Sequence, residues 1–425
     1  MKYQSKFNYK LHIFAIDFKT MGDFSGIRGQ FPALEQKVYG KQLVYFDNAA
    51  TAQKPRAVLD LIQRMNGGIN ANIHRAVHKL SAEATDLYEG GREAVRQYIN
   101  AARREEVIMT SGTTASINLV ANTYGERFLS KGDVVLVSEC EHHSNIVPWQ
   151  LLCERKGAEL RVLPVDEKGQ WRMDMLDGLL DERVKIVSAT HISNVLGLVN
   201  PIEELISKAH AAGAVVLIDG AQGIVHQRVD VQKLDCDFYV FSGHKIYAAT
   251  GIGVLYGKEA LLEKMPPWMG GGDMVGTVTF AKTTYAPLPL KFEAGTPNFI
   301  GGATLAPALQ FAQELMSDKY IEEEREKIDY LNNNLQAIDG LRLYGVGENK
   351  IPVFSFSIEG AHHEDLALLL DKMGVAVRSG MMCAEPLMER FGQSGMLRAS
   401  LAPYNTLEEC KFFMTALHRA VNMLR

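Results

Sequence analysis

The chain has 425 residues and a formal net charge of −5, and 47% of its residues are hydrophobic and 22% are charged. This composition is ordinary for a soluble globular protein of two or three domains, and the slightly acidic balance gives no reason to expect nucleic-acid binding. No apolar run approaches the roughly 18 residues that a membrane-spanning helix needs, so we expect no membrane span.

The five cysteines are odd in number and form no C-x-x-C pair. This argues against a disulfide scaffold and against a zinc site, and it fits a protein of the reducing cytoplasm. The five are Cys140, Cys153, Cys236, Cys383 and Cys410.

The beginning of the chain carries a short apolar stretch at residues 11–16, which Asp17 follows directly. The stretch is too short for a signal peptide and has no small-residue cleavage site after it. We therefore predict that residues 1–20 are a dispensable extension, and that residues 21–40 form a segment packing against a small C-terminal domain.

Between residues 41 and 300, short β-branched runs alternate with helical patterns. One helical stretch, 201–212, opens with Pro201 and stops before Gly213, as helices often do. The order predicts a large domain, 41–300, with a mostly parallel sheet covered by helices and a ligand site at the carboxyl ends of the strands. The predicted strands are Val134–Ser138, Val184–Thr190, Val215–Asp219, Phe238–Ser242 and 253–256.

Beyond residue 300, a long helical region at 301–338 has a charged middle. Shorter apolar runs and two further helical stretches follow it. We interpret residues 301–425 as a smaller α/β domain. Its runs lie at Val353–Ile358, 375–377 and 397–400, and its helical stretches at His363–Lys372 and Leu407–Leu424.

Two of the predicted strands end in residues that pyridoxal phosphate requires. Asp219 closes one strand, and Lys245 follows another within a Ser-Gly-His-Lys turn. The lysine amine can form a Schiff base with the cofactor aldehyde, and the acid can keep the pyridine nitrogen protonated. The helix start at 110–114 offers hydroxyl and amide groups to a phosphate. Each feature alone has an ordinary alternative, such as a buried acid, a surface lysine or a helix cap, but together they predict this cofactor.

With these residues in place, the chain resembles the class V, fold-type I pyridoxal-phosphate enzymes, and specifically the Suf-type (SufS/CsdA-like) cysteine desulfurases, from about residue 27 onward. The resemblance implies a large domain with a mostly parallel seven-stranded sheet covered by helices, and a smaller C-terminal domain that carries a catalytic cysteine loop. The stretches that carry it are 45–51, 72–75, 141–145, 191–194, 242–245, 292–297 and 378–384.

The resemblance implies how the cofactor would be held. Lys245 would bind it covalently, Asp219 would pair with the pyridinium nitrogen, and Gln222 would reach the phenolic oxygen. His142 would stack on the ring and relay protons. The phosphate would be held by a polar set to which a second subunit of a homodimer adds the last member: Thr113, Thr114, Ser242, His244 and Thr296.

It also implies a substrate site. Asn194 and Arg398 would hold the α-carboxylate of L-cysteine, for which a guanidinium suits because it can bind both oxygens at once. Residues lining the site would be Arg378, His74 and Ala50.

Cys383 would be the thiol that receives the substrate sulfur as a persulfide. Its neighbours are turn-like and Arg378 lies close in sequence, which favours the thiolate, whereas the other cysteines read as small buried hydrophobes. The family commonly has His directly before this cysteine, where this chain has Met382, so the group that tunes the thiol stays open.

The implied function is a cytoplasmic cysteine desulfurase, a sulfurtransferase that makes L-alanine and passes sulfur to a SufE- or SufU-like protein for iron–sulfur cluster assembly. Selenocysteine lyase and a class V aminotransferase are the enzymatic alternatives, and a non-catalytic scaffold is the alternative of another class. An aminotransferase would not need Cys383. No metal site is expected.

Overall fold

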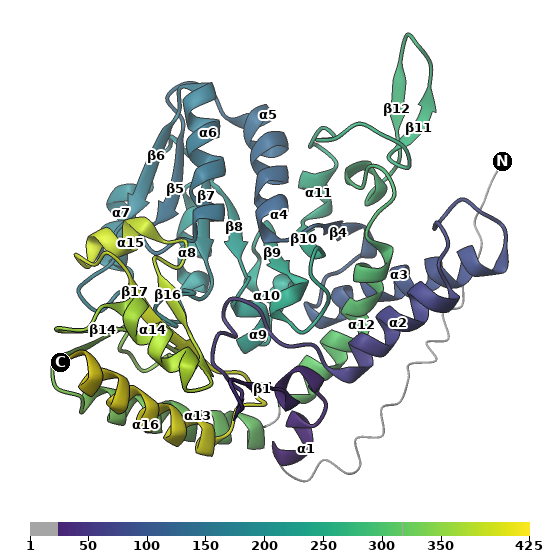
Figure 1. Cartoon of the computed structure of the whole chain (residues 1–425). Helices are drawn as coiled ribbons and strands as arrows, with labels where there is room; N and C mark the ends of the chain where they lie inside the picture. Colours follow the sequence, from purple (N-terminus) through teal and green to yellow (C-terminus); the bar gives the residue numbers. More distant parts are fainter. Residues whose placement is uncertain (1–23, 317) are drawn as a thin grey trace.

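A seven-stranded sheet forms the centre of the larger part of the molecule in this computed structural model, which describes residues 24–316 and 318–425 (Figure 1). The strand order is β4-β10-β9-β8-β7-β5-β6, and β10 alone runs against its neighbours. The strands are β4 (Val107–Thr110), β5 (Val134–Ser138), β6 (Glu159–Leu163), β7 (Val184–Thr190), β8 (Val215–Asp219), β9 (Phe238–Ser242) and β10 (Gly253–Gly257).

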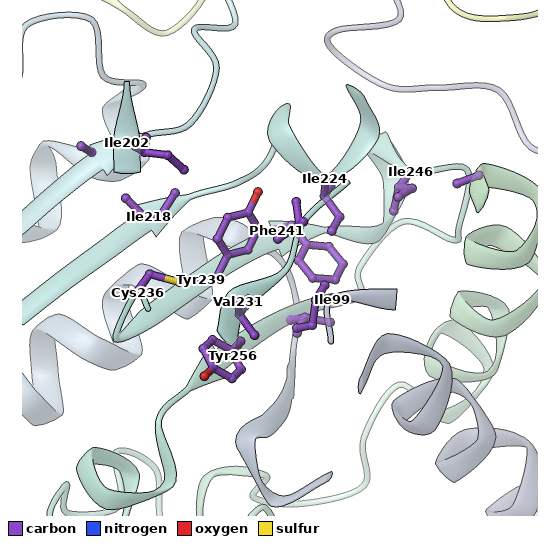
Figure 2. Packing of buried hydrophobic residues seen from close by; sticks show 14 of the residues in the cluster. Ile99, Ile202, Ile218, Ile224, Val231, Cys236, Tyr239, Phe241, Ile246 and Tyr256 are labelled. Atoms are coloured by element: carbon purple, nitrogen blue, oxygen red, sulfur yellow. The ribbon is translucent and has the colours of Figure 1, made fainter. Parts of the chain in front are cut away.

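Helices cover both faces of this sheet, so its central strands are apolar on both sides. In β9, Tyr239 and Phe241 point into one core while Phe238 and Val240 point into the other. A strand buried on both faces reads as a continuous hydrophobic run, which is why the sequence locates these strands. Figure 2 shows the first core, where Tyr239 and Phe241 lie among aliphatic side chains that include Ile224.

The helices of this part differ in which core they cover. Helices α3 and α12 pack along each other and contribute to the first core, whereas α4 and α6 contribute to the second. Their bounds are α2 (Arg56–Gly68), α3 (Lys79–Tyr98), α4 (Thr113–Val120), α5 (Glu126–Phe128), α6 (Val147–Lys156), α7 (Met173–Leu179), α8 (Ile202–Ala211), α9 (Gly223–His226), α10 (Val231–Leu234), α11 (Glu259–Leu262) and α12 (Phe299–Glu314).

A second, antiparallel sheet in the order β13-β14-β17-β16 builds the smaller part around its own core. Its strands are β13 (Leu341–Tyr344), β14 (Val353–Ile358), β16 (Arg378–Gly380) and β17 (Met396–Ser400). Its helices are α13 (Asp318–Gln336), α14 (His363–Lys372), α15 (Glu385–Arg390) and α16 (Leu407–Leu424).

The chain preceding α2 joins the two parts. Strand β3 (Val44–Tyr45) pairs in parallel with β15 (Val375–Ala376), and Asp47 bridges to Ser400 at the end of β17. Val44 and Phe46 lie in the core of the smaller part. The remaining N-terminal elements are α1 (Phe24–Arg28), a 3-10 helix (Pro32–Glu35), β1 (Lys37–Val38) and β2 (Lys41–Gln42).

A hairpin of β11 (Val275–Val278) and β12 (Thr283–Tyr285) projects away from the rest of the molecule (Figure 1). Its apolar side chains Val278, Phe280 and Tyr285 are exposed. A hairpin of two strands is marginal by itself and gains stability by packing on another surface.

The predicted fold class is confirmed, and the five strands predicted in the large domain are present. Sequence reasoning missed β4 and β6, and the predicted helical region 301–338 is two helices, α12 and α13. Helix α12, which follows the predicted domain boundary at residue 300, packs with α2 and α3 of the larger part. The boundary itself stays a prediction. The predicted extension 1–20 lies outside the described residues. No helix within residues 24–316 and 318–425 has both the length and the apolarity to cross a membrane.

Candidate active site

A cavity of about 250 Å³ opens where β7, β8 and β9 end, between the larger sheet and the strands β16 and β17 of the smaller one. Every predicted site residue lines it except His74 and Thr296. The predicted residues that the structure brings together are Ala50, Thr113, Thr114, His142, Asn194, Asp219, Gln222, Ser242, His244, Lys245, Arg378, Cys383 and Arg398.

Lys245 and Asp219 face this cavity from neighbouring strands. Asp219 is the last residue of β8, and Lys245 ends a short 3-10 turn that follows β9. Burial lowers the pKa of Lys245, and the Asp219 carboxylate opposes that shift only in part. Burial likewise raises the pKa of Asp219 against the attraction of Lys245. The pair therefore combines an amine that loses its proton readily with an acid that lacks a full counter-charge.

The His142 ring enters the cavity from the loop after β5. Its Nδ1 lies 3.1 Å from the donating Ser144 amide and 2.8 Å from the Ser144 hydroxyl, which leaves the ring proton on Nε2. Burial, followed by the charge of Lys245, lowers the pKa of His142 to about 4. The ring is therefore neutral at physiological pH and can stack or exchange a proton through Nε2.

The buried carboxylate of Glu141 anchors this loop to its surroundings. It accepts hydrogen bonds from the Asn145 amide at 2.6 Å, from the Thr190 backbone at 2.8 Å, and from the Ser138 hydroxyl. The side chain is fully buried, and burial raises its pKa to about 8. Glu141 thus fixes the loop that carries His142 without reaching the cavity itself.

The other end of the cavity is built for an anion. Helix α4 begins at Thr113, whose amide donates to the Ser242 hydroxyl at 2.8 Å. A helix start directs free N–H groups and a positive partial charge toward a phosphate. Gly253 of β10 allows the close approach, because a Cβ there would lie 2.4 Å from the Cα of Gly112.

The peptide that joins His244 to Lys245 is held by three donors. The His244 carbonyl accepts from the Ala52 amide at 3.1 Å, the Thr51 hydroxyl at 3.2 Å and the Lys54 amine at 3.1 Å. Burial lowers the pKa of Lys54 to about 8. Sequence reasoning missed Lys54, and no local pattern distinguishes it from a surface lysine.

The substrate end is dominated by Arg398, which is buried on β17. One guanidinium nitrogen donates to the Asn194 carbonyl at 3.0 Å and another to the Asp47 carboxylate at 3.2 Å. The buried Nε has no hydrogen-bond partner among the described residues. An orphan buried donor costs free energy unless a ligand satisfies it, so it fits a bound carboxylate.

Asp47 also binds Arg378, at 2.7 and 3.2 Å, and so bridges the two arginines of the site. The Asn194 amide donates to the Met382 carbonyl at 3.0 Å, which ties it to the cysteine loop. Asp47 lies inside one of the motifs that carried the resemblance. Its position between the two arginines could not be predicted from the sequence, because Asp47 and the arginines lie far apart along the chain.

Cys383 is the exposed cysteine, and the other four are buried. It lies in the loop between β16 and α15 and lines the same cavity as Lys245 and Arg398. By contrast, burial raises the pKa of Cys140 to about 12 and that of Cys153 to about 11. Of the five thiols, only that of Cys383 is both exposed and among the cations of the cavity.

His74 and Thr296 lie outside the cavity of this single chain. His74 has a left-handed backbone (φ 69°), and its Nε2 lies 3.0 Å from Glu89, which is paired with the buried Arg92. Thr296 is exposed on the loop before α12. Their predicted roles at the site stay predictions.

The residues present fit pyridoxal phosphate. A buried acid that lacks a full counter-charge stands where a pyridinium nitrogen would provide one, and a helix start with two hydroxyl side chains stands where a phosphate would bind. Within the described residues, no cluster of three or more metal-ligating side chains competes with this assignment.

Comparisons with known proteins agree with this chemistry. The aminotransferase class-V family model matches residues 44–413. The chain is 49% identical over 404 residues to the probable cysteine desulfurase of Vibrio cholerae, covering 95% of this chain and 100% of that one. It is 47% identical over 399 residues to the cysteine desulfurase of Cronobacter sakazakii, covering 94% and 98%.

Two solved structures are similar along nearly their whole length. The cysteine desulfurase CsdA (S-sulfonic acid) from Escherichia coli has a TM-score of 0.87 and 40% identity, covering 95% of this chain and 99% of that one. The apo cysteine desulfurase from Thermococcus onnurineus has a TM-score of 0.87 and 33% identity, covering 93% and 99%. The chain therefore belongs to the aminotransferase class-V family and, within it, to the cysteine desulfurases.

Proposed function

We propose that this protein is a pyridoxal-phosphate-dependent cysteine desulfurase that converts L-cysteine to L-alanine and takes the sulfur onto Cys383. The observation that carries the proposal is the placement of one exposed thiol in the same cavity as Lys245, Asp219 and Arg398. An aminotransferase would have no use for that thiol.

Pyridoxal phosphate, when bound, supplies an aldehyde that joins covalently to amines and a ring that draws electrons from the substrate α-carbon. Lys245 provides the amine for the resting enzyme. Asp219 would keep a proton on the ring nitrogen, and Gln222 lines the same cavity. The start of α4 would hold the phosphate together with Ser242 and His244.

Arg398 orients the substrate. Its unpaired Nε can donate one hydrogen bond, and a cysteine carboxylate placed there would accept it and satisfy a buried donor that otherwise has no partner among the described residues. Arg378 lies at the same end and is held by the same Asp47 carboxylate. The two guanidinium groups therefore fix which end of the amino acid faces Lys245 and which faces Cys383.

Lys245 serves as the base that takes the α-proton. Burial lowers the pKa of its amine, which favours the unprotonated form that a base needs. The neutral His142 ring, with its proton on Nε2, can pass a proton to or from the substrate on the other side of the cavity.

Cys383 then performs the sulfur transfer. Its thiolate attacks the sulfur of the substrate, so that a new S–S bond forms while the substrate carbon–sulfur bond breaks. The bonding pair stays on the carbon, which is later protonated to give alanine. The sulfur remains on Cys383 as a persulfide. Arg378 and Arg398 line the same cavity as the attacking sulfur.

The acceptor of this sulfur is, on our proposal, a SufE- or SufU-like protein that serves iron–sulfur cluster assembly. The exposure of Cys383 supports delivery to a partner that comes to the cavity. The loop that carries it, between β16 and α15, is short and anchored at both ends, so the thiol cannot travel far on its own.

We also propose that the protein works as a homodimer. The projecting β11–β12 hairpin exposes Val278, Phe280 and Tyr285, an apolar set that would be covered by a second copy. Thr296, exposed and outside its own cavity, could then complete the phosphate site of the other subunit.

Mass spectrometry of Cys383 tests the proposed function directly. After incubation of the holoenzyme with L-cysteine, the peptide holding Cys383 should gain one sulfur, and alanine should form in matching amount. Cys383→Ser should keep the cofactor absorbance but form no persulfide, and Lys245→Ala should lose the covalent cofactor. Cys153→Ser is the matched control and should behave as the wild type. Unchanged desulfuration by Cys383→Ser would overturn the assignment.

A further inference from the structure

The loop that carries Cys383 has an unfavourable backbone conformation. Met382 and Cys383 are consecutive non-glycine residues with left-handed backbones, with φ of 54° and 55°. The side chain of an L-residue crowds the backbone in this region, so such a pair persists only where neighbouring groups hold it. The structure must therefore contain contacts that keep this loop in place.

The contacts come from the larger part of the molecule and meet the loop on both sides of the cysteine. The Cys383 carbonyl accepts a hydrogen bond from the His143 backbone N–H at 2.8 Å. The Glu385 N–H, the first of α15, donates to Nε2 of the His143 ring at 3.1 Å. Asn194 adds the bond to the Met382 carbonyl. His143 alone thus binds the residue that carries the thiol and the helix start just after it.

His143 follows His142 directly, so its contacts with the Cys383 loop join that loop to a residue of the substrate cavity. The His142 ring lines the cavity, and Glu141 anchors the same loop from below. One short segment therefore fixes both the ring that faces the substrate and the loop that presents the thiol. Neither Met381 nor Met382 offers a hydrogen-bonding ring that could do this from within the loop.

We propose that His143 is a positioning residue for sulfur transfer: through its backbone amide and its ring it clamps the Cys383 loop against the substrate cavity. The inference rests on the proposed role of Cys383 as sulfur acceptor. His143 touches neither the cavity nor the reacting atoms. Its ring therefore acts on the distance and angle at which the Cys383 thiolate meets the substrate sulfur.

The test distinguishes an effect on the position of the Cys383 loop from an effect on the reaction of the cofactor with cysteine. His143→Ala removes the ring acceptor for the Glu385 N–H and leaves the backbone bond in place. His143→Gln restores an acceptor, because its side-chain oxygen can reach about as far as Nε2. His362→Ala is the matched control, since His362 also accepts from the first turn of a helix, at Glu364 of α14.

Three rates are measured on each holoenzyme. Iodoacetamide alkylation of resting Cys383, followed by peptide mass spectrometry, should become about fivefold faster in His143→Ala, because one hydrogen bond that held the loop is lost. Persulfide formation on Cys383 in a single turnover should become about tenfold slower, because the thiol is less well aligned. The change in cofactor absorbance on adding cysteine should stay at the wild-type rate. His143→Gln should restore both Cys383 rates, and His362→Ala should leave both unchanged.

A second variant removes the same bond from its other end, together with the Glu385 carboxylate, which lies 3.8 Å from Nε2 of the His143 ring. Glu385→Pro deletes the donor N–H at a helix position where proline is tolerated. If the ring acts through this bond, the double variant His143→Ala/Glu385→Pro should be no slower than either single variant. Wild-type alkylation and persulfide rates in His143→Ala would overturn the positioning role. Absence of a persulfide on wild-type Cys383 would instead overturn the proposed function.

Discussion

At the residue scale, the substrate end of the cavity depends on one carboxylate shared by two arginines. Asp47 binds Arg378 and Arg398, and together with the Asn194 carbonyl it accepts one hydrogen bond from each terminal guanidinium nitrogen of Arg398. Arg398 is buried, and burial lowers its pKa against the opposing charge of Asp47. A buried cation held in this way keeps its charge and its direction, which a mobile surface arginine would not.

Replacing Arg398 by lysine tests this arrangement. Lysine keeps the charge but offers one compact donor group in place of a planar fork, so it cannot serve Asp47, Asn194 and a carboxylate together. We expect kcat/KM for L-cysteine to fall roughly tenfold to a hundredfold, mostly through KM, with unchanged cofactor absorbance. Steady-state alanine formation measures it, and Arg161→Lys is the control, because Arg161 pairs with Glu159 and Asp181 and does not line the cavity. A wild-type KM in Arg398→Lys would contradict the assignment.

At the element scale, the phosphate end depends on how closely β10 approaches the start of α4. Strand β10 runs against its neighbours and lies between β4 and β9. Gly253 at its start packs against Gly112, and a Cβ there would also lie 2.7 Å from the Phe241 carbonyl. The three nearest atoms are all backbone atoms, of Gly112 and Phe241, so there is no flexible side chain that could move aside.

Gly253→Ala should therefore displace the anion site. We expect a loss of about 1–3 kcal/mol of stability from overpacking and a weaker hold on the cofactor. Thermal unfolding and cofactor absorbance after dialysis measure the two effects. Gly178→Ala is the control, because no atom lies within 4 Å of a Cβ added in α7, and it should be neutral or slightly stabilising. Equal cofactor retention in the two variants would contradict this account.

The elements also explain what the sequence could and could not predict. Strands such as β8 and β9 are apolar on both faces and end at or just before residues with an evident chemical purpose, so their bounds and the Lys245–Asp219 pair could be predicted. The clamp at His143 and the bridge at Asp47 could not, because each joins segments more than 200 residues apart. Such contacts depend on how the two sheets meet, and no local pattern encodes that arrangement.

At the scale of the whole molecule, buried histidines make stability depend on pH. His191 is buried, and its Nδ1 lies 3.0 Å from the Tyr239 hydroxyl. Burial lowers its pKa from 6.5 to about 4. At pH values between about 4 and 6.5, His191 is protonated in the unfolded chain but not in the folded protein. The free energy of unfolding therefore falls as pH falls from about 6.5 to about 4.

Urea unfolding of the holoenzyme at pH 7 and pH 5 tests this linkage. His191 should account for roughly 2 kcal/mol of the loss of unfolding free energy between these two pH values. His191→Gln, which keeps a partner for the Tyr239 hydroxyl but does not titrate, should lower that difference by this amount whatever its stability at pH 7. An unchanged difference would show that His191 takes up its proton in the folded state.

Thr296 lies outside the cavity of its own chain, so a role at the phosphate would require a second subunit. If it binds the phosphate in the other subunit, Thr296→Ala homodimers should hold the cofactor roughly tenfold to a hundredfold more weakly, as expected for a lost hydrogen bond to a charged group. Cofactor titration by absorbance measures this, with the exposed Thr415→Ala as control.

Hybrid dimers then decide in which subunit Thr296 acts. One tagged chain carries Lys245→Ala and the other carries Thr296→Ala. If Thr296 crosses the interface, one site of the hybrid loses both residues and the other is intact. Such hybrids should show about half the wild-type dimer activity with wild-type cofactor affinity, as two-fold symmetry requires. If Thr296 acts within its own chain, the only site with a lysine lacks Thr296, and the hybrid should bind cofactor as weakly as the Thr296→Ala homodimer. A hybrid of that kind, or a protein that sediments as a monomer, would exclude the shared site.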